Sequence, residues 1–545
     1  MSKKFDVFSN EFTYNIFKQK YSMNAQESWE DTCKRVVSAV CGQLLPNELQ
    51  EEICEAMIAR KFIPGGRYLY SAGRQFHQVN NCFLFRAHDS REGWADAMQK
   101  ATAALMTGGG IGFDYSRLRP KGAKITKTGG ESTGPIALME MINESGRFIM
   151  QGGARRSAIW AGLNWNHADI KAFIHLKDWP EDLKKLKEKD FTFRMPMEGT
   201  NISVIYDTDF FVAIEDKNHT DHKLAKEIWN LNCKQAFSTA EPGMSFNFMK
   251  DAESLRNACT EVVSEDDSDK CNLGTVWLNR FDNRDEFARV CHISTVFLLC
   301  GGIYSDVPNE KIKEVGNKNN RIGLGLGGMH EWLVRRDLPY AANPELHKWL
   351  NVYEQESDAA AYVWAKKLNV SVPKGKRAIA PTGTIGIIAE TTTGIEPLFC
   401  KAYKRRYLKG QDWHYEYVVD GAVKRLLEQG IKKEQIQDAY DIGFKDRVKF
   451  QADVQNYVDM SISSTCNLPQ WGTEENNEST VAKNSKTLLK YAKRLRGFTC
   501  YPDGARGGQP LTRVTLETAM SKEGQVFEDS SLDVCDLTKG GKCGD

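Results

Sequence analysis

A cysteine flanked by an amide and a carboxylate forms the most reactive segment of this 545-residue chain. Asn257, Cys259 and Glu261 occupy alternate positions, and Cys271 follows ten residues after the glutamate. If the segment is extended, alternation places the first three side chains on one face. A plain cysteine nucleophile requires a histidine and a cationic surrounding, which this segment lacks. The residue types therefore indicate radical chemistry at the thiol.

Three further segments combine glycine with hydroxyl or cationic side chains, as phosphate-binding loops do. They are residues 107–122, residues 151–157 and residues 380–386. None carries a Walker lysine, so we expect a nucleotide that serves as substrate or signal and is not hydrolysed. Taken alone, each segment is as consistent with a plain loop. Residues 323–328 match G-x-G-x-x-G, but no buried strand precedes them, so we expect close helix packing there.

The elements that must position these residues alternate between two patterns from about residue 62 to residue 399. Short apolar runs at residues 201–206, 275–278 and 385–388 predict strands, and amphipathic stretches between such runs predict helices. Strands that alternate with helices predict a parallel sheet or barrel, with the site at the strand ends.

Helical periodicity also marks residues 28–60, which we expect to form a small helical entry region. After residue 400 the chain turns basic, which is most often a solvated face, and then follows a helical pattern to Arg496. From about residue 507 periodicity is lost, which predicts a mobile tail.

Composition narrows the class of protein. The 73 basic and 72 acidic side chains leave a net charge of +1, which argues against a nucleic-acid-binding chain. The chain has no apolar run long enough to span a membrane and no signal-peptide pattern, so we expect a cytoplasmic protein. Its 14 cysteines include no C-x-x-C pair, so we expect neither a disulfide framework nor a metal site. Seven lie among apolar neighbours and are expected to be buried, namely Cys33, Cys41, Cys54, Cys233, Cys291, Cys300 and Cys400.

A series of motifs extends in one order over nearly the whole chain from about residue 28. The motifs are Asn81-Cys82-Phe83, Asp89-Ser90, the glycine run 108–112, Asn257-x-Cys259-x-Glu261, Cys271-Asn272-Leu273-Gly274, residues 380–385, Gly394-Ile395-Glu396-Pro397 and a cysteine-bearing tail. In this order they resemble the catalytic chains of ribonucleotide reductases. Their style is similar to the adenosylcobalamin-dependent class II enzymes.

The resemblance implies an α/β fold, a ten-stranded α/β barrel of the ribonucleotide reductase and glycyl radical enzyme type. Two five-stranded parallel halves would be set antiparallel around a finger loop that carries Cys259. The expected organisation is a helical region at residues 1–60, the catalytic barrel at residues 61–506 and a flexible redox-active tail at residues 507–545. The stretch before Asn81 is too short for an ATP-cone domain, so we expect none, and no overall activity switch by ATP and dATP.

The resemblance also assigns roles to the reactive segment. Cys259 would carry the thiyl radical that removes the 3′-hydrogen of a ribonucleotide. Glu261 would act as the base at the 3′-hydroxyl, and Asn257 would hold the ribose hydroxyls. Cys82 and Cys271 would supply two electrons as the 2′-hydroxyl leaves as water, and would close a disulfide in doing so.

The remaining roles concern nucleotides and reductant. The substrate would be bound by Asn81, Thr382, Gly383, Thr384 and Ile385. A deoxynucleotide effector would contact Asp89 and Ser90, with Arg155 and Arg156 on the loop that links effector to substrate. The tail pair Cys535 and Cys543 would pass electrons from a thioredoxin or glutaredoxin-like protein, although their spacing is wider than the family leads us to expect. Cys466 and Cys500 are alternatives to that pair.

The radical source follows from motifs that the sequence lacks. It has no Tyr-Tyr pair of the class I type, no glycyl radical segment of the class III type and no Asp-x-His-x-x-Gly motif. These patterns favour adenosylcobalamin, bound without a protein histidine. One alternative is a class I-type large subunit that needs a separate radical-generating subunit, and another is a nucleotide-sensing protein on an inactive reductase scaffold. Diphosphate or triphosphate substrate, and monomer or homodimer, stay open.

Overall fold

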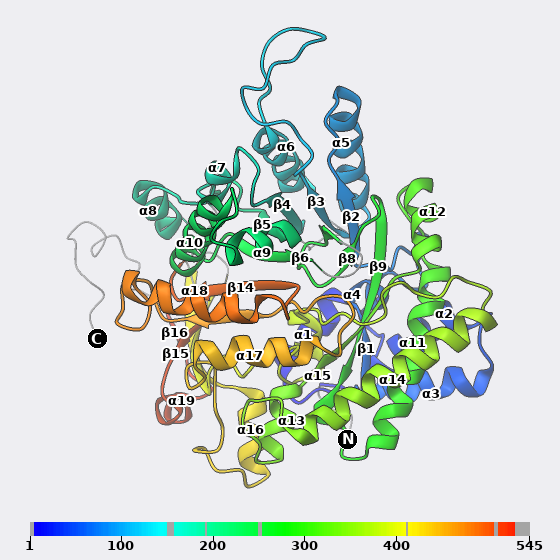
Figure 1. Cartoon of the computed structure of the whole chain (residues 1–545). Helices are drawn as coiled ribbons and strands as arrows, with labels where there is room; N and C mark the ends of the chain where they lie inside the picture. Colours follow the sequence, from blue (N-terminus) through cyan, green and yellow to red (C-terminus); the bar gives the residue numbers. More distant parts are fainter. Residues whose placement is uncertain are drawn as a thin grey trace.

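Five consecutive strands of the main sheet run parallel and pair in chain order (Figure 1). The computed structural model describes residues 5–149, 157–190, 193–248, 253–409, 412–505 and 511–528. Pairing is parallel from each strand to the next. The strands are β2 (Cys82–Arg86), β3 (Gly110–Asp114), β4 (Ile159–Asn164), β5 (Thr200–Asp207) and β6 (Gly243–Asn247). The helices between them are α5 (Arg91–Met106), α6 (Pro135–Phe148), α7 (Ile170–Ile174), α8 (Glu181–Lys189), α9 (Thr208–Glu215) and α10 (His222–Thr239).

A second set of parallel strands begins at β9 (Asp269–Trp277). β10 (Ile322–Gly327) pairs with β9, and β13 (Thr465–Leu468) pairs with β14 (Gly497–Pro502). Two isolated parallel pairings, Leu324 with Arg377 and Ile379 with Ile462, span the interval between β10 and the residues that lead into β13. The helices of this half are α11 (Arg284–Tyr304), α12 (Glu310–Asn319), α13 (Met329–Arg335), α14 (Pro344–Lys367), α15 (Gly383–Ala389), α17 (Phe444–Gln455) and α18 (Glu478–Ala492).

The two halves meet antiparallel at both junctions. β2 pairs antiparallel with β9 at one junction, and β6 pairs antiparallel with β14 at the other. The short strand β1 (Phe62–Pro64) extends the sheet antiparallel to β9, which gives a ten-stranded sheet. The α/β fold with two parallel halves set antiparallel is therefore confirmed.

Burial explains why these segments form strands. All nine residues of β9 are buried, as expected for a strand covered on both faces. Glycines let the next strand approach: a Cβ on Gly325 of β10 would lie 2.7 Å from the carbonyl oxygen of Ala378. The expectation of helix packing at residues 323–328 is therefore wrong, because these residues are mainly β10. The apolar run at residues 385–388, expected as a strand, lies in helix α15.

Helices α1 (Glu11–Lys20), α2 (Trp29–Cys41) and α3 (Asn47–Ile58) precede the sheet, and the helical periodicity of residues 28–60 is confirmed. A capping box between Ser28 and Asp31 starts α2. The buried faces of α2 and α3 pack on α11, so these helices share a hydrophobic core with the second half of the sheet (Figure 1).

The segment after residue 400 contains a hairpin where the sequence suggests helices. β11 (Ala402–Lys409) pairs antiparallel with β12 (Asp412–Val419), and the basic run at residues 401–406 lies mostly in β11. Residues 511–528, assigned to the tail, form β15 (Leu511–Arg513), α19 (Leu516–Lys522) and β16 (Val526–Glu528), and both strands pair with the hairpin. Helix α16 (Gly421–Glu428) shares their small hydrophobic core.

One helix within the described ranges, α11, is long and apolar enough to pass a composition test for a membrane span. In the apolar window of this helix, 67% of the residues are buried inside the protein. Helices α2, α3 and α14 pack against it. α11 is thus a core helix in this fold.

Candidate active site

Cys259 lies in the loop of a short hairpin, between β7 (Leu255–Arg256) and β8 (Val263–Ser264). The amide of Thr260 donates to the carbonyl of Asn257 at 3.1 Å, and Thr260 has a φ of +69°. The side-chain oxygen of Asn257 accepts from the amide of Val262 at 2.9 Å. The segment is therefore a turn, and the expectation of strand-like alternation across residues 257–261 is wrong.

This finger loop packs closely against strand β3. A Cβ on Gly112 would lie 1.9 Å from the carbonyl oxygen of Arg256, and one on Gly110 would lie 3.0 Å from the side chain of Ala258. A larger residue at position 112 would displace the hairpin. Two glycines of the run at residues 108–112, which the sequence analysis considers as a phosphate loop, thus make room for the finger loop, namely Gly110 and Gly112.

Cys82 and Cys271 face each other across the junction of the two half-sheets. They are register partners in the antiparallel pair of β2 with β9. Opposed residues in such a pair have Cα atoms about 4.5–5.5 Å apart, within the range of a disulfide. Both side chains are buried, and both belong to an apolar cluster that includes Leu84, Val262 and Met460. The register therefore allows this dithiol to close a disulfide without a change of strand pairing.

Asn257 and Glu261 converge on the first of these thiols. The amide nitrogen of Asn257 lies 2.9 Å from Cys82 Sγ, and this sulfur lies 4.0 Å from Glu261 Oε1. The other carboxylate oxygen of Glu261 is buried and has no hydrogen-bond partner among the described residues. Asn257 and Glu261 therefore do lie close together, as expected, but a turn brings them together and not the alternation of a strand.

Burial sets the protonation of these groups. It raises the pKa of Glu261 to about 7, against a smaller opposing effect of hydrogen bonds, including one with Asn257. It also raises the pKa of the Cys82 and Cys271 thiols well above their ordinary value. Both thiols therefore stay protonated near neutral pH, which favours loss of a hydrogen atom over attack by a thiolate. Cys259 is only half-buried and is the accessible thiol of the three.

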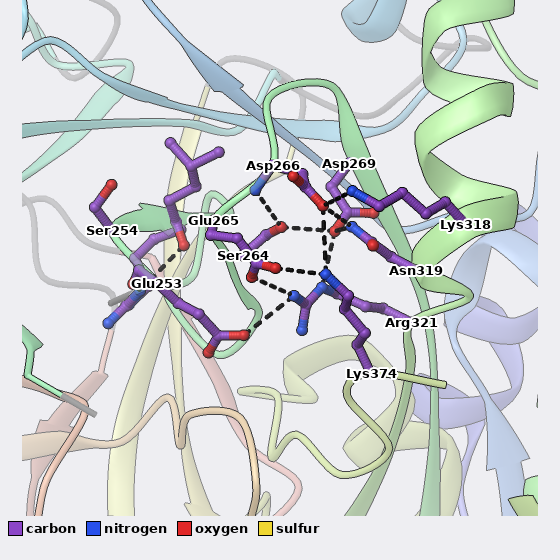
Figure 2. Close-up of polar contacts among 12 residues, drawn as sticks. Glu253, Ser254, Ser264, Glu265, Asp266, Asp269, Lys318, Asn319, Arg321 and Lys374 are labelled. Carbon is purple, nitrogen blue, oxygen red and sulfur yellow. Dashed lines mark hydrogen bonds and ion pairs between the residues drawn. The ribbon is translucent and has the colours of Figure 1, made fainter. Parts of the chain in front are cut away.

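A buried guanidinium holds the base of the finger loop (Figure 2). Arg321 has a side chain that is 1% exposed, and its Nε lies 2.8 Å from Asp269. Its Nη2 lies 3.1 Å from both Glu253 and Glu265, which flank the two arms of the hairpin. Arg496, which precedes β14, also pairs with Glu253 at 2.7 Å. These ion pairs tie the finger loop to β9 and to β14.

Sequence patterns do not predict this network of ion pairs. Its one signal is that charged residues, such as Asp269 and Arg321, stand at the starts of apolar strands. Partners at distant positions cannot be derived from that signal.

The expected substrate loop stands at the start of α15. Thr382, with a φ of +51°, precedes the helix, and its hydroxyl accepts from the amide of Gly394 at 3.2 Å. Among the described residues, no atom lies within 4 Å of a Cβ built on Gly383, so they leave open space beside it. Ala380 packs against the apolar cluster that contains Cys82 and Cys271, so the loop begins beside the dithiol. The same loop includes Thr384 and Ile385.

Asn81 directly precedes Cys82 and is partly committed to the fold. Its side-chain oxygen accepts from the amide of Leu273 at 3.2 Å, and its amide group lies against Gly65. The contacts hold β2 next to β9. Because the side-chain oxygen is used in this way, the side-chain nitrogen of Asn81 is the group that would bind a ligand.

The expected effector residues stand beyond the end of β2. Ser90 caps α5 by accepting from the amide of Gly93 at 2.9 Å, and Asp89 pairs with Arg119 at 2.8 Å. The structure thus places both at the beginning of one helix. Arg155 and Arg156, like the tail cysteines Cys535 and Cys543, lie outside the described residues.

The other described cysteines are buried or half-buried among the packed elements of the fold. Of the seven expected to be buried, all except Cys54, which is half-buried, are buried. Cys466 and Cys500 are register partners on β13 and β14, and Cys500 Sγ lies 3.3 Å from the carbonyl oxygen of Ala236 in α10. They belong to the core under the helices of the first half, apart from the cluster of Cys82, so this placement gives no route for exchange with a partner.

Comparison with known proteins adds to this geometry. Residues 80–356 and 375–501 match the family described as ribonucleotide reductase, barrel domain. A protein of Thermoplasma acidophilum named vitamin B12-dependent ribonucleoside-diphosphate reductase is 29% identical over 87% of this chain and 68% of its own length. A protein of the same name from Mycobacterium tuberculosis is 25% identical over 91% of this chain and 78% of its own length. A large chain of ribonucleoside-diphosphate reductase from Schizosaccharomyces pombe is 24% identical over 61% of this chain. The family match covers most of the barrel and both opposed cysteines, and the chain belongs to the ribonucleotide reductase barrel family.

Proposed function

We propose that this protein reduces ribonucleotides to 2′-deoxyribonucleotides by a thiyl radical mechanism that depends on adenosylcobalamin. The observation that carries the proposal is the register of Cys82 opposite Cys271, with Asn257 and Glu261 directed at Cys82. The cobalamin dependence rests on the relatives named vitamin B12-dependent, which match up to 91% of the chain.

The cofactor suits the residues of the site. Within the described part of the chain, no group of three or more His, Cys, Asp or Glu side chains could hold a metal ion. Cobalamin brings its cobalt already coordinated by its own ring, so the chain need supply no such group. The half-buried Cys259 leaves a thiol accessible to the cofactor. When bound, the cofactor supplies the first radical through homolysis of its carbon–cobalt bond.

The residues of the chain divide the reaction among them. The Cys259 thiyl radical takes the 3′-hydrogen, and Glu261 takes the proton of the 3′-hydroxyl, for which a pKa of about 7 is well suited. Asn257 holds the ribose hydroxyls. The C2′–O bond then breaks, and the 2′-hydroxyl leaves as water with a proton from the dithiol.

The dithiol balances the reaction. Cys82 and Cys271 give two electrons and two hydrogens, and their S–S bond forms as the C2′–H bond forms. Glu261 then returns its proton to the 3′-oxygen, and Cys259 regains its radical when it returns a hydrogen atom to C3′. One water and one disulfide are produced for each deoxyribonucleotide.

Further turnover requires that the buried disulfide be reduced by thiol exchange. We assign this step to Cys535 and Cys543, which a thioredoxin or glutaredoxin-like protein would reduce in turn. The loop from Thr382 to Ile385 would bind substrate phosphates together with Asn81. Asp89 and Ser90, with Arg155 and Arg156, would bind a deoxynucleotide effector in a monomer or a homodimer.

The alternative of a class I-type large subunit is less well supported. Relatives named large chain match 61% of this chain, whereas those named vitamin B12-dependent match 86% to 91%. A nucleotide-sensing protein on an inactive scaffold would not require the opposed thiols and the buried carboxylate to be intact.

Anaerobic turnover of CDP and CTP by the purified chain tests the proposal. The assay contains a dithiol and a deoxynucleotide effector, with or without adenosylcobalamin. Product that requires cobalamin and no second protein is expected, and the better substrate reveals the phosphate level. Cys259→Ser should abolish product. Turnover without cobalamin, or turnover by Cys259→Ser, would contradict the mechanism.

A further inference from the structure

A second buried charge stands directly beside the site, on the opposite face of β9. Lys270 precedes Cys271, and alternation along the strand directs the two side chains to opposite faces. A pocket of ≈ 480 Å³ lies where β9 meets the end of α11 and the helix α12. Its lining includes Lys270, Lys313, Asn317 and Asn320. The volume falls within the range of small-molecule sites.

The ammonium of Lys270 is poorly compensated. Lys270 is 5% exposed, and its Nζ donates to the carbonyl oxygen of Gly302 at 3.2 Å. Its stem runs against Gly316, where a Cβ would lie 2.3 Å from it. The described ranges contain no ion pair of Lys270, and the neighbouring Asp269 is committed to Arg321 at 2.8 Å. An ammonium has three donors, so two are left for a ligand.

Burial has the expected electrostatic effect on this lysine. It lowers the pKa of Lys270 to about 8, although the charge of Asp269 opposes the change. A buried ammonium without a counter-ion is unfavourable to the fold. Capping the end of α11 through Gly302 recovers part of this cost. An exposed lysine would cap α11 equally well, so the cap does not explain why Lys270 is buried beside an open pocket.

The two carboxylates that line the pocket do not serve as that counter-ion. Asp306 accepts from the amide of His77 at 2.9 Å, and the ring of His77 lies 3.4 Å from it. The side chain of Glu310 is 91% exposed and is directed to solvent near Lys313, 3.9 Å away.

We infer that this pocket binds a small anion, a molecule with a carboxylate or phosphate group, through the ammonium of Lys270. The anion would take the two remaining N–H donors, and the amide of Asn317 would add a neutral hydrogen bond, whereas the amide nitrogen of Asn320 already donates to the carbonyl oxygen of Ser371 at 2.6 Å. The site is distinct from the substrate and effector residues proposed above. It stands behind the strand of Cys271, and Lys270 is the register partner of Phe83, which follows Cys82.

Thermal unfolding of the full chain tests the inference with inorganic phosphate and acetate as probes. A ribonucleotide and a deoxynucleotide are present to fill the other phosphate sites, and sodium chloride of equal ionic strength is the reference. The variants are Lys270→Met, which keeps the length of the side chain, and Lys313→Met at the exposed rim. Phosphate stabilises proteins generally by exclusion, so only differences between variants are informative.

One or both probes should raise the unfolding temperature of the wild type and of Lys313→Met beyond the chloride reference. Lys270→Met should lose this anion-specific shift, with probe affinity about tenfold or more weaker. The anion whose shift is reduced most by Lys270→Met identifies the class of ligand. An equal shift in Lys270→Met and wild type, or no shift beyond chloride in the wild type, would overturn the inference.

Chemical labelling provides a second measurement that needs no variant. Pyridoxal phosphate with borohydride labels accessible lysines through their neutral amine, so a lowered pKa speeds labelling at pH 8, and peptide mapping identifies the labelled residues. Inorganic phosphate should protect Lys270 several-fold while exposed lysines such as Lys313 remain labelled. Labelling of Lys270 that is the same with and without phosphate would also refute the site.

Discussion

Replacement of Glu261 by glutamine gives a direct test of the buried carboxylate. Glu261 is 2% exposed, and burial raises its pKa from an ordinary 4.5 to about 7. Since one pKa unit corresponds to about 1.36 kcal/mol, the ionised carboxylate costs the folded state ~3 kcal/mol. Glutamine keeps the size and hydrogen-bonding capacity of the side chain and removes its charge.

The cost has a defined dependence on pH. The folded chain binds the proton of Glu261 more tightly than the unfolded chain, so the contribution to stability is complete below pH 4.5 and is lost as the pH rises to about 7. The wild type and Glu261→Gln should therefore be about equally stable at pH 4.5 and below. Above pH 7 the variant should be more stable by up to ~3 kcal/mol.

Urea unfolding across this pH range measures the difference. The same variant should lose turnover by about 100- to 10,000-fold, the usual contribution of a general base. A variant that is less stable at pH 8, or a stability difference that does not change with pH, would refute the argument.

Glu265→Gln is the matched control from the same hairpin. Burial would raise the pKa of Glu265, but the hydrogen bond from Lys374 and the charge of Arg321 outweigh it and lower the pKa. This variant should thus be less stable than the wild type at neutral pH, with a difference that closes on acidification.

Three further changes test other contacts of the site. Gly112→Ala should lower kcat at least tenfold, because its Cβ would meet the Arg256 carbonyl at 1.9 Å; Gly421→Ala, with 3.7 Å to its nearest neighbour, is the control in the same kinetic assay. Arg321→Met removes the ion pair of the buried carboxylate of Asp269 and should lower the free energy of unfolding by ~3–5 kcal/mol in urea titrations. Cys271→Ser should prevent sustained turnover, whereas wild type without reductant should form one Cys82–Cys271 disulfide per chain, detectable by peptide mass.

The sequence predicts those strands and helices that depend on the pattern of neighbouring residues. The short apolar run at residues 201–206 lies in β5, the run at residues 275–278 lies in β9 except for its last residue, and the periodicity of residues 28–60 gives α2 and α3. The family motifs added the antiparallel halves, which no local pattern contains. Residue types alone pointed to the segment around Cys259, because a thiol between an amide and a carboxylate is unusual.

Other features depend on contacts between distant residues. Thr260 adopts a φ of +69° without glycine, so no sequence signal marks the turn of the finger loop. Gly112 allows the backbone of Arg256, 144 positions later in the chain, to approach closely. Its neighbours in the sequence suggest only a glycine-rich phosphate loop. The sequence did not predict the hairpin of β11 and β12, because basic residues such as those at 401–406 occur on the solvent-exposed faces of helices and strands alike.

The order of the elements along the chain explains how the five groups of the site are held in fixed positions. Asn257, Cys259 and Glu261 lie on the hairpin that leads directly into β9, which carries Cys271, so a short stretch of chain fixes four of the five groups. Cys82 arrives from β2, and its position is set by the ladder register at the antiparallel junction. A one-residue slip there would turn Cys82 to the other face of the sheet. The junction register, more than any single contact, therefore determines whether the dithiol can form, and Arg321 stabilises it by binding Asp269 two residues before Cys271.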